Sequence, residues 1–206
     1  MSKPELFLNQ AEITRAKRRA EEHDWAKELV AKLMSDAEKA LAVPLPELDW
    51  RWWDEAKAAG TQPAELYKPM GDIQVQAADS QQAARALAQA YLFKADERFA
   101  RRVREIMLHF VRTYRLDVVY WDSGMTYGNV ATLFLEAYQY CWDVFDSDDH
   151  ETLRQWFLGL RQSVYDSAYL WIEKMPGGAF NNHYSHHKQS LLTIEFFLGL
   201  EPNIEF

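Results

Sequence analysis

The chain has 206 residues, of which 48% are hydrophobic and 26% charged, so a packed core is well within reach. Its formal net charge of −8 argues against a general nucleic-acid-binding protein, because such proteins need clustered lysine and arginine. Aromatic residues are abundant, with 8 Trp, 10 Tyr and 11 Phe. Most are expected in the core, and Trp and Tyr also provide faces on which sugar rings stack.

Cysteine content and hydropathy limit the cellular compartments in which the chain is expected. Cys141 is the single cysteine, so no intrachain disulfide can form. No stretch approaches the roughly 20 apolar residues of a membrane span, and residues 1–10 lack the profile of a signal peptide. Neither a membrane nor nucleic acid is therefore an expected partner. The sequence as it stands is expected to be cytoplasmic. If an export signal has been removed from it, the protein is expected to be periplasmic or secreted.

Helical periodicity begins near the N-terminus. Asn9 and Glu12 have the spacing of a capping box, and Asp24 is the next expected N-cap. Residues 43–80 interrupt the periodicity with four prolines and two glycines, which predicts a long ordered loop. Three tryptophans lie in this segment, and a place partly in the core is favoured for them over a surface for sugar: Trp50, Trp52 and Trp53.

Helices are predicted again after Ser80. Residues 81–115 have the pattern of two helices that meet near Lys94. A turn at residues 120–129 leads into the next helix, and Asp148 with Glu151 predicts a second capping box before another. A Pro-Gly-Gly loop at residues 176–178 precedes the last helix. No strand pattern and no fixed-period repeat is present, so the predicted fold is all-α, with antiparallel helices.

Four stretches resemble one known family. Residues 87–114 have the form of a helix pair with an "AY" step and a following "DERFA" start, and residues 123–145 that of the next inner helix. Residues 181–200 supply "NNH" before an apolar helix, and residues 4–29 match the opening helices. These stretches together resemble the α/α-toroid polysaccharide lyases of the heparinase II/III and alginate-lyase group.

The resemblance implies an incomplete (α/α) toroid of antiparallel helix hairpins. Residues 1–206 are expected to form a single domain that is the N-terminal part of a longer protein. A complete toroid of this family has more helices than this chain supplies. The family's usual catalytic Tyr and Arg lie downstream of the Asn-His pair, and the resemblance places them beyond Phe206.

The family's chemistry is β-elimination beside a uronic acid, with alginate the favoured polymer and glycosaminoglycans the alternative. Donors neutralise the uronate carboxylate, a base removes the C5 proton and an acid protonates the departing O4. The resemblance assigns carboxylate neutralisation to Asn182 and the role of base or second neutralising group to His183, since a neutral imidazole accepts a proton near pH 7. Substrate contacts are expected from six further residues: Trp53, Tyr127, Asn129, Asn181, Tyr184 and His187.

The expected partner is thus an acidic polysaccharide or oligosaccharide, and no cofactor is expected. Other interpretations of the same residues stay open. Asn181 and Asn182 fit a turn and an N-cap. His183, His186 and His187 share one helical face, as zinc ligands do, but no HExxH pattern and no nearby Cys or carboxylate completes a set, so no metal is predicted.

Two further motifs resemble catalytic motifs of other enzyme classes. Residues 146–149, "DSDD", match the DxDD acid of class II terpene cyclases, but they lie between two amphipathic helices and are interpreted as a solvated loop. Asp122 in "YWDSG" matches the catalytic Asp of unsaturated glucuronyl hydrolases, whose chemistry needs a positioned acid and a water. Such a hydrolase is one alternative to the lyase, and a non-catalytic, carbohydrate-binding helical module is the other.

Overall fold

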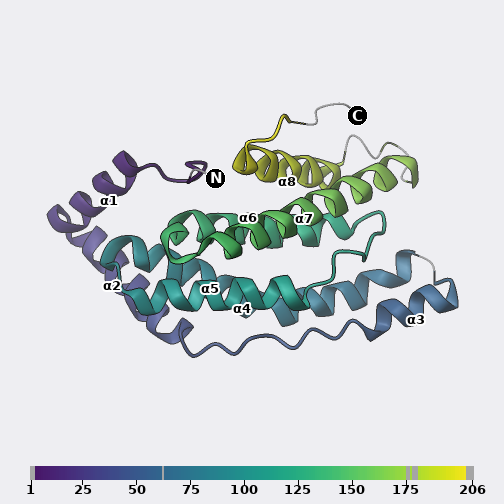
Figure 1. Cartoon of the computed structure of the whole chain (residues 1–206), viewed down its shortest axis with the longest axis horizontal. Coiled ribbons are helices and arrows are strands. Elements are labelled where there is room, and N and C mark those ends of the chain that lie inside the picture. Colours follow the sequence, from purple (N-terminus) through teal and green to yellow (C-terminus); the bar gives the residue numbers. More distant parts are fainter. Residues whose placement is uncertain (1–2, 62, 175–176, 178–180, 203–206) are drawn as a thin grey trace.

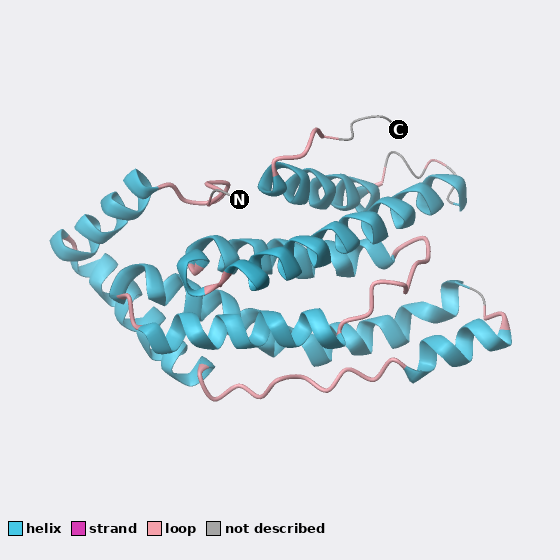
Figure 2. Ribbon diagram, in the orientation of Figure 1, coloured by secondary structure: helices cyan, strands magenta, loops and turns pink. Residues whose placement is uncertain are grey.

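The protein is built from helices alone in the part of the chain that the structure describes. The computed structural model describes residues 3–61, 63–174, 177 and 181–202, so most of the predicted Pro-Gly-Gly loop lies outside the described residues. These ranges contain helices and no strand (Figures 1 and 2), which confirms the all-α prediction. The elements are α1 (Gln10–Glu22), α2 (Asp24–Ala40), α3 (Arg51–Ala59), η1 (Pro63–Leu66), α4 (Tyr67–Lys94), α5 (Glu97–Thr113), α6 (Ser123–Tyr140), η2 (Trp142–Val144), α7 (Ser147–Lys174) and α8 (Asn182–Leu198), where η marks a 3₁₀ turn.

Helices α4 to α8 lie side by side, and each runs antiparallel to the one before it (Figure 1). Helix α6 is central to this arrangement, since it packs against α4, α7 and α8. Within the ranges described above, none of the helices combines the length and apolar character that crossing a membrane requires.

The ends of the first two helices follow from local sequence. The Asn9 carboxamide oxygen accepts a hydrogen bond from the Glu12 N–H, and the Glu12 carboxylate accepts one from the Asn9 N–H, both at 3.0 Å. The predicted capping box is therefore confirmed. The prediction of Asp24 as an N-cap is wrong, because the helix already includes Asp24 and the capping position belongs to His23.

The later helix ends depend on two aspartates. Asp96 caps α5 by accepting from the Arg98 N–H at 3.0 Å, after Ala95 has turned the chain with a φ of 49°. This confirms two helices that meet near Lys94. The predicted Asp148–Glu151 box is wrong, because α7 begins at Ser147 and the carboxylate of Asp146 accepts from the N–H groups of residues 148 and 149.

The long loop predicted for residues 43–80 is wrong beyond residue 50. Helix α3, η1 and the first half of α4 occupy the rest of this segment. Pro69 is compatible with α4 because it lies in the first turn, where a backbone N–H has no partner within the helix. Gly60 ends α3 with a left-handed φ of 66°, which glycine adopts readily. Residues 43–50 form an irregular stretch that runs along the lower edge in Figure 1.

Aromatic packing holds the bundle together. The rings of Phe110 on α5 and Phe134 on α6 meet edge to face, with 4.8 Å between their centroids. Trp156 on α7 packs against Phe134 from the other side, and all three side chains are buried. These rings belong to one buried cluster that also includes side chains of α4 and α8, so a single core joins the helices of the bundle.

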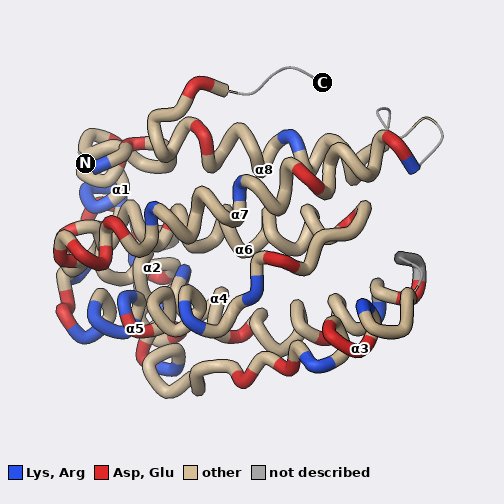
Figure 3. The backbone as a smooth tube through the Cα atoms, turned by 45° about the vertical axis from the view of Figure 1, so that its right-hand side comes forward, with Lys and Arg blue, Asp and Glu red and all other residues tan. Residues whose placement is uncertain are grey.

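Charged residues are distributed unequally between the helices. Helices α1, α2 and α5 have many residues of both charges, and blue and red segments are frequent along this part of the chain in Figure 3. Helix α6 has a single charged residue, Glu136, whose carboxylate accepts hydrogen bonds from Arg85 and Gln89 of α4, both at 2.8 Å. Glu195 on α8 is fully buried and accepts from the Arg161 guanidinium of α7 at 2.8 Å. Buried carboxylates thus link α6 to α4 and α8 to α7.

Two glycines allow α6 to lie very close to its neighbours. A Cβ atom added to Gly128 would lie 1.9 Å from the Ser190 hydroxyl oxygen of α8. A Cβ atom on Gly124 would lie 2.9 Å from the His187 ring of α8 and 3.0 Å from the Ser167 hydroxyl of α7. Any larger residue at either position would push these helices apart.

This close packing is tested by one pair of substitutions. Gly128→Ala is expected to lower the free energy of unfolding by about 1–3 kcal/mol, because the methyl group overlaps Ser190. Gly71→Ala on α4 is the matched control, since a Cβ there meets no atom within 4 Å. The control is expected to raise stability by about 0.5–1 kcal/mol through helix propensity. Urea unfolding followed by tryptophan fluorescence measures both, and equal effects would contradict the close α6–α8 contact.

Candidate active site

Three segments converge at the end of the bundle where α6 and α8 begin. They are the connection between α5 and α6, the last turns of α7 and the first turns of α8. In Figure 1 this end lies to the right. The connection is held in place by Tyr127, whose hydroxyl accepts from the Val118 N–H at 3.1 Å and lies 3.0 Å from the Arg115 carbonyl oxygen. Residues 117–122 are therefore fixed from inside the core.

A histidine–carboxylate pair lies at this end. The Nδ1 atom of His183 is 2.8 Å from the Oδ1 atom of Asp122. The Asp122 side chain is only 7% exposed, whereas His183 is 32% exposed. A carboxylate at Nδ1 favours the tautomer with its proton on that nitrogen, which leaves the lone pair on Nε2. His183 is thus an oriented base that solvent can reach.

Local sequence fixes the position of His183. Asn181 is the N-cap of α8, and its side-chain oxygen accepts from the His183 N–H at 2.8 Å. The Trp171 ring of α7 stacks on the imidazole, with 4.9 Å between centroids and 17° between planes. Trp121 in turn packs against Trp171 at 4.9 Å. The imidazole is held by its backbone, its carboxylate partner and one ring face.

A second histidine lies behind the pair. His187 is fully buried, its Nε2 atom is 3.8 Å from Asp122 Oδ1, and its ring stands perpendicular to Trp171. Neither of its ring nitrogens has a hydrogen-bond partner among the described residues. Burial lowers the pKa of His187 to about 4, so it is neutral at pH 7. Asp122 therefore lies between one exposed and one buried imidazole.

The other predicted site residues lie in different places. Tyr127 and His187 are fully buried, so the predicted contact of either with a substrate is not compatible with this conformation. Asn129 is exposed and lines a cavity of about 380 Å³ between α4, α6 and α8. Tyr184 lines a separate open groove beside Phe7 of the N-terminal segment. Asn182 is exposed as the first residue of α8, next to His183.

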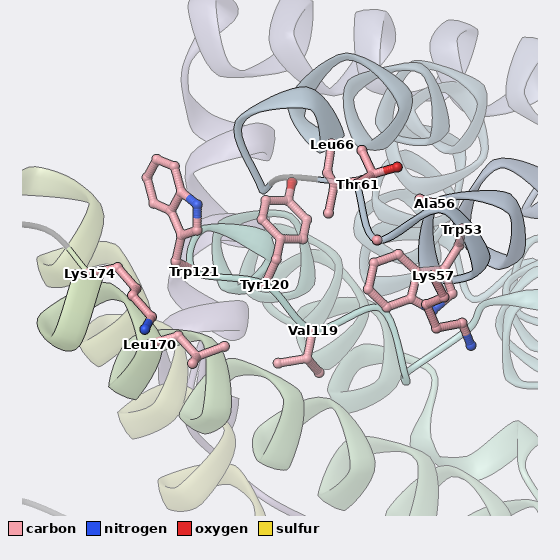
Figure 4. Close-up of a pocket in the computed structure, with 11 residues that line it drawn as sticks. Trp53, Ala56, Lys57, Thr61, Leu66, Val119, Tyr120, Trp121, Leu170 and Lys174 are labelled. Carbon is pink, nitrogen blue, oxygen red and sulfur yellow. The ribbon is translucent and has the colours of Figure 1, made fainter.

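A further cavity adjoins the pair on the side of Trp121. It has a volume of about 260 Å³ and lies between α3, the residues before α6 and the end of α7. Figure 4 shows Trp53 and Trp121 at its two ends, with Tyr120 between them. Lys57 and Lys174 also line it. Trp53 is thus the one predicted substrate-contacting residue that lines this cavity, and it is 8% exposed.

The local pattern did not predict the part that three residues take in this site. Asp122 is 61 positions from His183, and its motif indicated a hydrolase rather than a partner for histidine. Trp121 and Trp171 stood in segments that were predicted as a turn and as an ordinary amphipathic helix. No group of three or more His, Cys, Asp or Glu side chains among the described residues is arranged to hold a metal ion. The contact of Asp122 with His183 Nδ1 is the feature that supports acid–base chemistry at His183.

The burial of His187 has a measurable consequence for stability. Because the folded state disfavours its charged form, the unfolded chain binds a proton first as the pH falls. The free energy of unfolding is therefore expected to keep its full value above pH 6.5 and to fall between about pH 6.5 and about pH 4. The titration of His187 is expected to account for a fall on the order of 3 kcal/mol. Urea unfolding across this pH range measures the slope.

Two variants identify the residue responsible. His187→Asn is expected to reduce the fall in stability between pH 6.5 and pH 4, whatever its effect on stability at pH 7. His23→Asn, which replaces an exposed histidine at the far end of the bundle, is expected to keep the wild-type slope. Parallel curves for wild type and His187→Asn would show that another group titrates.

Comparisons with known proteins do not assign this site. A scan against protein-family models finds no match, and a search of curated protein sequences finds none either. The Asp122–His183 pair and the cavity near Trp121 are the features of the chain that bear on its function.

Proposed function

We propose that this chain belongs to a polysaccharide lyase that cleaves uronic-acid-containing polymers by β-elimination, alginate being favoured over glycosaminoglycans. The observation that carries the proposal is the 2.8 Å contact between His183 Nδ1 and Asp122 Oδ1. It supplies an oriented, accessible base next to an exposed carboxamide, that of Asn182. These are the two kinds of group that removal of a proton beside a carboxylate requires.

The reaction step assigns one role to each group. His183 Nε2 takes the C5 proton, the electrons of that bond form the C4=C5 double bond, and the bond from C4 to O4 breaks. The departing O4 takes up a proton from solvent. The Asn182 amide donates a hydrogen bond to the uronate carboxylate. The partial positive charge at the start of α8 also attracts this carboxylate.

The surroundings of His183 suit the charge that this step creates. Asp122 stabilises the imidazolium that forms when Nε2 accepts the proton. The Trp171 ring, stacked on the imidazole, adds a favourable cation–π contact in that state. His187 stays neutral near pH 7, so it places no competing positive charge beside Asp122. These surroundings therefore allow His183 to accept a proton and to release it again.

The finer assignment of the fold is part of the same proposal. The antiparallel pairs formed by α4 with α5 and by α6 with α7, with α8 added beside α6, support an incomplete (α/α) toroid. The position of Asp122 weighs against a glucuronyl hydrolase, because its carboxylate is 7% exposed and is engaged by His183. A carbohydrate-binding module without catalysis would keep the cavity and lack turnover.

The proposal is tested by ultraviolet absorbance of the C4=C5 double bond. Wild-type protein is mixed separately with alginate, heparan sulfate, chondroitin and hyaluronan, and absorbance is expected to rise on one of them. His183→Ala is expected to lower the rate by at least about 10²-fold, because it removes the base. Asp122→Asn is expected to lower it by a similar factor, because an amide N–H facing Nδ1 favours the wrong tautomer and the carboxylate that stabilises the imidazolium is lost.

Controls separate chemistry from folding. His23→Ala removes an exposed histidine far from the pair and is expected to keep the wild-type rate. Circular dichroism of each variant reports whether the helices are intact. A flat trace on all four polymers from folded wild-type protein contradicts the lyase, and binding without turnover indicates the binding module instead.

A further inference from the structure

The cavity beside Trp121 has an unusual lining for this chain. The chain as a whole has 31 acidic and 23 basic residues. The described residues that line the cavity include two lysines and no aspartate or glutamate. Lys57 is 3.5 Å from both Asp54 and Asp117, whereas Lys174 is exposed at the end of α7. Lys57 is thus compensated by two carboxylates, and the exposed Lys174 is the positive charge that this cavity offers to an anion.

The shape and the rings of the cavity suit a single sugar ring. Trp53, Tyr120 and Trp121 present aromatic surface to it (Figure 4). Its volume of about 260 Å³ is below the range of about 300–1,000 Å³ that is typical of sites for drug-sized ligands. Aromatic side chains combine an apolar face with a polar edge, which matches the alternating apolar and hydroxylated surface of a pyranose.

The cavity is connected to the histidine pair by stacked rings. Trp121 lines the cavity and packs against Trp171 at 4.9 Å, and Trp171 stacks on His183 at the same centroid distance. Two ring contacts thus separate the cavity from the base. A ligand in the cavity would therefore contact Trp121 and not His183 itself.

We infer that this cavity is a subsite for the uronate residue that neighbours the one cleaved, and that Lys174 binds its carboxylate while Trp121 packs on its ring. The inference rests on the proposed function and adds a requirement to it. The preferred polymer carries uronates on consecutive residues, because a neutral sugar in this cavity leaves the lysine without an anion. An unbroken run of uronates is therefore favoured over an alternating polymer.

Binding of a mannuronate trimer tests the subsite. The measurement is isothermal titration calorimetry on the full chain with His183→Ala, so that the probe is not consumed. Adding Lys174→Gln is expected to weaken binding by up to about fivefold, the effect of losing one exposed charge contact. Adding Trp121→Ala is expected to weaken it by about tenfold through loss of stacking.

Matched controls isolate charge from shape. Lys17→Gln makes the same change on α1, at the opposite end of the bundle, and is expected to leave the dissociation constant unchanged. Mannotriose, which has no carboxylates, is expected to bind more weakly and with no sensitivity to Lys174→Gln. Equal losses for the charged and the neutral trimer would overturn the role of Lys174 as a carboxylate contact.

The outcomes distinguish this inference from the proposed function. Unchanged dissociation constants in both cavity variants, with elimination by wild type intact, overturn the subsite and leave the lyase. Lys174-dependent binding with no elimination by wild type supports the subsite and overturns the lyase. Absence of any binding of the mannuronate trimer overturns the subsite.

Discussion

The close approach of α6 to α8 is the constraint on which the site depends. Gly128 faces Ser190 and Gly124 faces His187, so the two helices lie almost backbone to backbone and run in the same direction. Both therefore begin at the same end of the bundle, which brings Asp122, just before α6, to His183 in the first turn of α8. The partial positive charge of a helix start favours a carboxylate at such a position. Helix packing thus places the Asp122 side chain at a helix start and within reach of His183.

Buried carboxylates determine how the outer helices attach to this pair. Glu136 joins α6 to α4 through Arg85 and Gln89, and Glu195 joins α8 to α7 through Arg161. Desolvation consumes much of the attraction in such pairs, so they add little net stability. We interpret them as fixing the register of the helices, because a shift along either axis would leave a charge buried in apolar surroundings. Register matters here, since Trp171 on α7 must meet the ring of His183.

Sequence patterns correctly predicted two features that depend only on neighbouring residues. The capping box at Asn9 and the helix junction near Lys94 were predicted correctly, because both follow from a few adjacent side chains. The loop predicted over residues 43–80 failed because proline and glycine were treated as interruptions, although Pro69 occupies a first turn and Gly60 a helix end. His183 was predicted as a candidate base, but its partner is 61 residues away. Only the packing of α6 on α8 brings them together, and no local spacing encodes it.

The N-terminal segment is held in place by a side chain that lies much further along the sequence. The Gln139 side chain on α6 accepts hydrogen bonds from the N–H groups of Leu6 and Phe7 and donates one to the Leu8 carbonyl oxygen. These contacts span more than 130 positions. During synthesis on the ribosome, residues 6–8 leave the exit tunnel before Gln139 and have to wait, without this partner, until Gln139 has emerged. At about 5–20 residues per second this wait lasts several seconds or more, so residues 6–8 are fixed in place well after they are made.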